Sequence, residues 1–149
     1  MYSKVLVPLD GSKTAQCSLE HVKTISIGCH VPEVFLLFVV EPVPMERYRG
    51  PSEDWNTLMA QGRESLAAIE RELVADGIAA KSIVLEGKPA DIIVDYAAKH
   101  NIDLIIMSTH GRSGPSRWAF GSVADRVIRS STVPVLIAVP QGCRTVISG

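Results

Sequence analysis

The sequence has little of what marks several large classes of protein. Its longest apolar run, 34–40, is seven residues, far too short to cross a bilayer. Pro8 and Asp10 interrupt the first apolar stretch too early for the core of a signal peptide. The 15 basic and 16 acidic residues leave a formal charge of −1, with no basic excess for nucleic acid or an anionic membrane. We therefore expect a soluble cytoplasmic protein without a nucleic-acid or membrane partner.

Patterned cysteines and histidines are also missing. The three cysteines are widely spaced and form no C-x-x-C pair, and the four histidines include no H-E-x-x-H. These spacings indicate neither a disulfide framework nor a zinc site. Cysteine usage of this kind is typical of a reducing compartment.

What the chain does have is the composition of one ordinary globular domain, with 149 residues, 46% of them apolar and 21% charged. Hydrophobic periodicity predicts an alternation of strands and helices. The expected strands are 5–9, 34–40, 81–86, 104–107 and 134–139; the expected helices are 15–25, 55–75, 89–100 and 122–131. A loop is expected at 45–54.

Two of these strands, 34–40 and 104–107, are apolar throughout, as strands buried on both faces of a parallel sheet are. Strands that alternate with helices predict an open, doubly wound α/β sheet with helices on both faces, of the flavodoxin or Rossmann type. We expect one domain at 1–140 and a C-terminal tail at 141–149.

In such a sheet, ligands bind beyond the carboxyl ends of the strands, where the strand order reverses. This directs attention to Asp10, to Val39 and the two residues after it, and to the segment that begins at Met107.

The segment 107–122 carries the most chemistry. Gly111 and Gly121 allow close approach of a ligand to the backbone, and Ser122 begins a helix whose free amides attract anions. Arg112, with Arg117 nearby, offers charge-assisted hydrogen bonds to phosphate, and His110 is the one base in the segment. Taken singly, each has an ordinary structural explanation: a helix cap, turn glycines, solvated arginines, a histidine that holds the loop. Together they favour a nucleotide site, although neither a Walker loop nor a G-x-G-x-x-G fingerprint is present.

At these positions the chain resembles the universal stress protein (UspA) superfamily over nearly its whole length. The matching segments are PLDGS at 8–12, LLFVVEP at 36–42, GKP at 87–89 and SSTVPVLI at 130–137. The nucleotide motif G-x2-G-x9-G-[ST] is matched through Gly111, Gly121 and Ser122, but Ser108 replaces its first glycine.

The resemblance implies five parallel strands, as in adenine nucleotide alpha hydrolase-like folds, and a bound adenine nucleotide, ATP or AMP. Its implied site residues are Pro8, Leu9, Asp10 and Val39 around adenine and ribose, Met107 and Ser108 along the nucleotide, and Gly111, Gly121, Ser122 and Val123 at the phosphates. Asp10 is also the implied side chain near a magnesium ion. The β-carbon of Ser108 could crowd the ligand, or its hydroxyl could donate to it.

These residues are compatible with three functions. The first is a nucleotide-binding stress sensor or regulator. The second is a slow or partner-triggered Mg-dependent ATPase, since the chain lacks the phosphate-loop lysine and the water-positioning glutamine of faster enzymes. The third is a dimeric scaffold that binds no nucleotide. A homodimer through the apolar last strand, Val135 to Val139, is expected because exposed sheet edges are seldom left bare, and the resemblance implies the same dimer.

Overall fold

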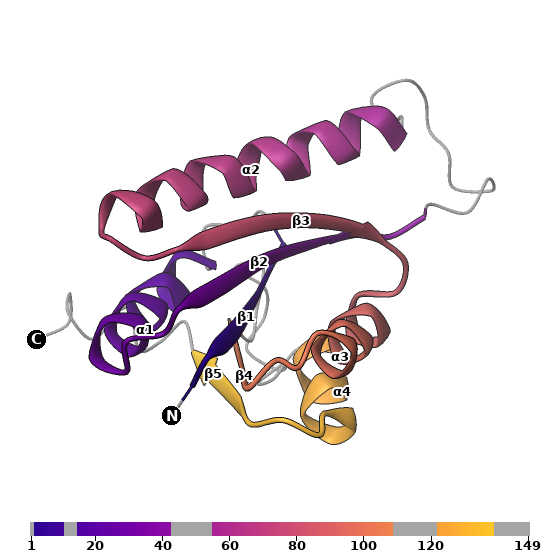
Figure 1. The fold of residues 1–149 in the computed structure, drawn as a ribbon. Coiled ribbons are helices and arrows are strands. Elements are labelled where there is room, and N and C mark those ends of the chain that lie inside the picture. The colour runs from indigo at the N-terminus through magenta and orange to yellow at the C-terminus, as the bar shows by residue number, and fades with distance from the viewer. Residues whose placement is uncertain (1, 11–14, 43–54, 109–121, 139–149) are drawn as a thin grey trace, which may run out of the picture.

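The computed structural model describes residues 2–10, 15–42, 55–108 and 122–138. Its five strands form one parallel sheet in the order β3-β2-β1-β4-β5, covered by helices on both faces (Figure 1). The elements are β1 Lys4–Leu9, α1 Ala15–Gly28, β2 Glu33–Val40, α2 Trp55–Ala75, β3 Ala80–Glu86, α3 Pro89–Lys99, β4 Leu104–Ser108, α4 Ser122–Ser130 and β5 Val135–Ala138. The predicted doubly wound α/β fold is confirmed.

The winding of the chain assigns each helix to a face. From β1 the chain moves outward through β2 to β3, with α1 and α2 on one face. It then returns to the other side of β1 and continues through β4 to β5, with α3 and α4 on the opposite face. Figure 1 shows α2 above the sheet and α3 and α4 below it. The reversal of strand order therefore falls between β1 and β4.

Successive side chains along each strand point to opposite faces of the sheet, and they form one apolar core on each face. On the α1/α2 face, Val7 and Ile106 pack with Leu66 of α2. On the α3/α4 face, Leu6 and Ile105 pack with other buried residues, among them Ile93 of α3 and Val127 of α4. Each fully buried aliphatic side chain of this kind contributes about 1.5–3 kcal/mol to stability.

The ends of the elements follow local sequence signals. Gly77, with φ of 83°, lies just beyond the end of α2 and donates its N–H to Val74 O at 3.0 Å, as the predicted stop requires. Pro89 begins α3 in the first turn, where its missing N–H costs nothing. Pro8 lies inside β1, which runs to Leu9 in register with Phe38, the same end as that of the predicted strand 5–9. The structure pairs β1 with β4 only at Val5 and Leu6, so the missing donor of Pro8 falls beyond that ladder.

The expected loop at 45–54 and the expected tail at 141–149 lie outside the described residues. Within the ranges that the structure describes, no helix has both the length and the apolarity needed to cross a membrane.

Candidate functional site

The carboxyl ends of β1, β2 and β4 meet at the reversal point of the sheet. Leu9 is in register with Phe38, so Asp10 follows β1 at the level of Val39 on β2. On the other side of β1, Leu6 pairs with Ile105, so Pro8 and Met107, each two residues further along, both lie near the carboxyl ends of these adjacent strands. Three of the predicted site segments, distant in sequence, therefore lie side by side on adjacent strands.

Four of the predicted residues share the face covered by α3 and α4. Val39 and Met107 belong to the apolar cluster of that face. Alternation from Leu6 places Pro8, and by continuation the exposed Asp10, on the same side. A carboxylate at the rim, apolar side chains below it and a reversal of strand order form an arrangement that suits a nucleoside.

Two predicted residues face the other way. Leu9 is buried in the core under α1 and α2, so only its backbone is available to a ligand on the α3/α4 face. Ser108 is the last residue of β4 and alternates with Met107, which directs its side chain toward α1 and α2. The β-carbon of Ser108 therefore points away from Asp10, Val39 and Met107, and the crowding considered from the sequence does not arise on their face.

The amino end of α4 completes the described part of the site. Ser122 is exposed at the first position of the helix, and Val123 is half-buried in the cluster that also contains Met107. The first amides of a helix have no partner within it, and its dipole favours an anion there. The start of α4 thus offers amide donors on the same face of the sheet as the residues from β1, β2 and β4.

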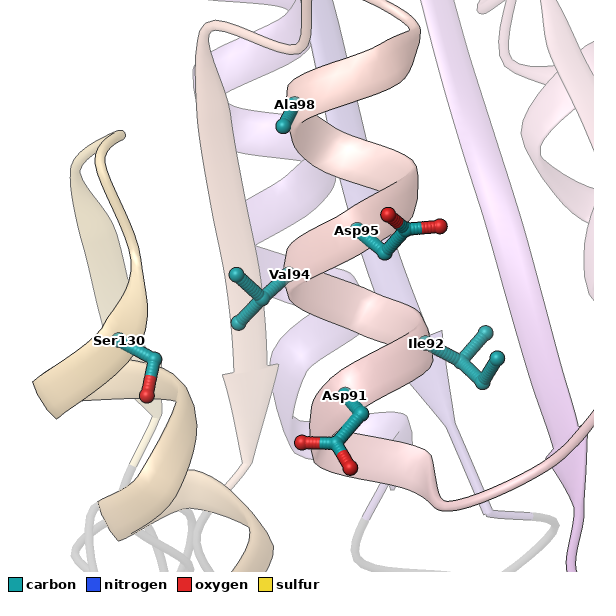
Figure 2. A pocket seen from close by; sticks show the side chains of 6 residues that line it. All are labelled: Asp91, Ile92, Val94, Asp95, Ala98 and Ser130. Carbon is teal, nitrogen blue, oxygen red and sulfur yellow. The ribbon is translucent and has the colours of Figure 1, made fainter.

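One charged pair joins the two helices of this face, and the sequence patterns did not single it out. Arg126 Nη2 of α4 lies 3.1 Å from Asp91 Oδ1 of α3. The only sequence signal for Arg126 is its position one turn after Ser122, because the pairing itself depends on how α3 and α4 pack. Asp91 also lines a groove of about 490 Å³ along α3, together with Ile92, Val94, Asp95 and Ala98 of α3 and Ser130 of α4 (Figure 2). None of the predicted site residues lines this groove.

Four predicted site residues, His110, Gly111, Arg112 and Gly121, lie outside the described residues, as does Arg117. Their roles stay predictions. In the part of the chain that is described, no group of three or more histidine, cysteine, aspartate or glutamate side chains forms a metal-binding cluster.

Comparison with known families gives a match over almost the entire chain. The model of the universal stress protein family matches residues 1–139. A curated relative, universal stress protein MJ0531 of Methanocaldococcus jannaschii, is 34% identical over 142 residues, which cover 92% of this chain and 82% of the relative.

Solved structures resemble the whole fold as well. The structure of MJ0577, described as a structure-based assignment of biochemical function, superposes with a TM-score of 0.81 at 33% identity and covers 93% of this chain and 96% of that one. A universal stress protein in complex with cAMP has a TM-score of 0.66 at 24% identity, covering 91% and 96% of the two chains. At that identity, the second likeness is one of fold.

Proposed function

Because the chain belongs to the universal stress protein family, we propose that it binds an adenine nucleotide, ATP or AMP, and acts as a stress-response sensor or regulator. The proposed site lies at the carboxyl ends of β1, β2 and β4, on the α3/α4 face. Since cysteine usage is typical of a reducing compartment, we place this activity in the cytoplasm.

The observation that carries the proposal is the convergence of Asp10, Val39 and Met107 beside the amino end of α4. An apolar floor with few polar groups is typical of small-molecule sites, and a helix amino end suits phosphate. One protein with this fold has been solved in complex with cAMP, so the fold itself can hold an adenine nucleotide.

In this proposal, the parts of the site have separate tasks. Pro8, the backbone of Leu9, Asp10 and Val39 border adenine and ribose, and Met107 and Ser108 lie along the nucleotide. Ser122 and Val123 donate their amides to phosphate. Gly111, Gly121, Arg112 and His110, which lie outside the described residues, are assigned to the phosphate end from the sequence alone.

A magnesium ion fits the proposed site through Asp10. The Asp10 carboxyl group is exposed at the end of β1, and magnesium commonly takes one or two protein carboxylates together with nucleotide phosphates and water. When bound, the ion would neutralise phosphate charge. Through this ion, Asp10 would help to orient the phosphate end of the nucleotide as well as border its ribose.

We also propose that the protein forms a homodimer through β5. The strands at the two edges of the sheet differ in character. The β3 edge strand carries exposed Lys81 and Glu86, which guard an edge against pairing. The β5 strand, Val135–Ala138, is entirely apolar, and three of its four residues are only half-buried. A second copy of the chain would cover these residues.

Substitution of Ser122 by aspartate tests the phosphate end of the site. Aspartate is favoured at a helix amino end, so Ser122→Asp should preserve or raise the stability of α4. It also places a negative charge where the phosphate binds, so the affinity for ATP and for AMP should fall by about tenfold or more. Calorimetric titration measures both affinities.

Ser130→Asp is the matched control, since it adds the same charge at the carboxyl end of α4, where Ser130 is exposed. It should bind nucleotide as the unmodified protein does. Equal affinities in Ser122→Asp and Ser130→Asp would exclude the amino end of α4 as the phosphate site.

A further inference from the structure

The ion pair between Arg126 and Asp91 lies on the same face of the sheet as the proposed phosphate position. Arg126 follows Ser122 by one turn, and residues four apart lie on the same side of a helix. Long helical side chains also lean toward the amino end of their helix. Asp91 is in the first turn of α3 and Arg126 is in the middle of α4, so the pair joins the amino end of α3 to the helix turn that follows Ser122. Figure 2 shows the Asp91 side chain on the side of α3 that faces α4.

The Arg126–Asp91 ion pair is weak enough for Arg126 to leave Asp91 and bind another anion. The side chains of Arg126 and Asp91 are 60% and 50% exposed, and ion pairs in contact with water are weak. Asp91 is also favoured by the amino end of α3, so it remains stabilised if Arg126 leaves. A phosphate group carries more negative charge than one carboxylate, and like a carboxylate it can accept two hydrogen bonds from the guanidinium of Arg126.

We propose that Arg126 changes its partner when the nucleotide binds, an inference that rests on the proposed nucleotide site. It pairs with Asp91 in the free protein and with a phosphate oxygen of the nucleotide in the complex. Arg126 is then a specificity residue for phosphorylated adenosine over adenosine itself. Because Asp91 belongs to α3, the same exchange releases a contact between α3 and α4 beside the groove that Asp91 lines.

The first test compares two arginines of α4. Arg126→Gln should lower the calorimetric affinity for ATP by about fivefold and leave the affinity for adenosine unchanged. Arg129→Gln is the matched control, because Arg129 is also exposed and paired, with Asp125 at 3.1 Å, but lies nearer the carboxyl end of the helix. It should affect neither affinity. Equal ATP affinities in the two variants would overturn the exchange.

The second test removes the competing carboxylate. Asp91→Asn should raise the affinity for ATP by about threefold, because Arg126 no longer has to leave a charged partner. In the Arg126→Gln background the same substitution should give no rise. An equal rise in both backgrounds would mean that Asp91 acts through general repulsion, and would overturn the exchange.

Two measurements on the same samples separate the possible failures. Thermal unfolding without nucleotide should show that all four variants remain folded. If the unmodified protein binds neither ATP nor AMP, the proposed function fails and the exchange fails with it. If the unmodified protein binds ATP and only the variant differences are missing, the exchange alone fails.

Discussion

At the scale of single residues, Gly62 fixes how closely α2 approaches the sheet. A β-carbon added there would lie 2.7 Å from Cδ1 and 2.9 Å from Cε1 of the half-buried Phe38 on β2. Gly62→Ala should therefore lower the free energy of unfolding by about 1 kcal/mol, because overpacking outweighs the better helix propensity of alanine. Urea unfolding measures this change.

Gly28 at the end of α1 is the control, since a β-carbon there would meet nothing within 4 Å. Gly28→Ala should raise the free energy of unfolding by about 0.5 kcal/mol. A Gly62→Ala protein as stable as Gly28→Ala would show that α2 and Phe38 adjust freely.

Ser108 shows what could and could not be predicted about the site. The sequence marked Ser108 as a departure from the nucleotide motif, but the predicted strand ended at Met107. The structure extends β4 by one residue, and this gives the Ser108 side chain a direction, toward α1 and α2. The Arg126–Asp91 pair lay beyond prediction for another reason, because it depends on the packing of two helices that are distant in sequence.

At the scale of elements, the alternation of apolar strands and amphipathic helices was sufficient to predict the order and type of all nine described elements. Periodicity specifies an element because its apolar face must be buried, whatever it packs against. The strand order and the register depend on long-range pairing, which a periodic pattern does not encode. Pro8 illustrates this, since its place inside β1 is possible only because the ladder to β4 ends before it.

The two edge strands allow a direct test of the proposed dimer. Ile137 on β5 and Ile83 on β3 are both half-buried, and both belong to the cluster of the α3/α4 face. Ile137→Lys should convert the dimer to a monomer, because a lysine on an edge strand opposes pairing. Light scattering at micromolar concentration measures the change in mass. Ile83→Lys should leave the dimer intact, and a monomeric unmodified protein would refute the proposed interface.

At the scale of the whole molecule, two groups make stability sensitive to alkaline pH. Hydrogen bonds to Glu72 and then Asp76 raise the pKa of Lys23, which joins α1 to α2 at Nζ–O distances of 2.6 and 2.9 Å. Burial raises the pKa of the Tyr96 hydroxyl, whose ring lies 3.9 Å from that of His100.

A group whose pKa is higher in the folded state contributes stability that is complete below its unfolded pKa and is lost as the pH rises beyond it. The free energy of unfolding should therefore fall above about pH 10. Tyr96→Phe keeps the ring and removes the titration, so it should make this fall shallower. Urea unfolding at pH 8 and pH 11 measures the slope, and identical losses in Tyr96→Phe and the unmodified protein would exclude a contribution from Tyr96.

The central claim is that an adenine nucleotide binds at the carboxyl ends of β1, β2 and β4. The most direct test is to identify the small molecules bound to the purified protein. Protein purified without added nucleotide is denatured, and the released small molecules are identified and quantified by mass spectrometry. We expect AMP or ATP in stoichiometric amount. Release of no adenine nucleotide, together with no thermal shift when ATP is added, would contradict the proposed function.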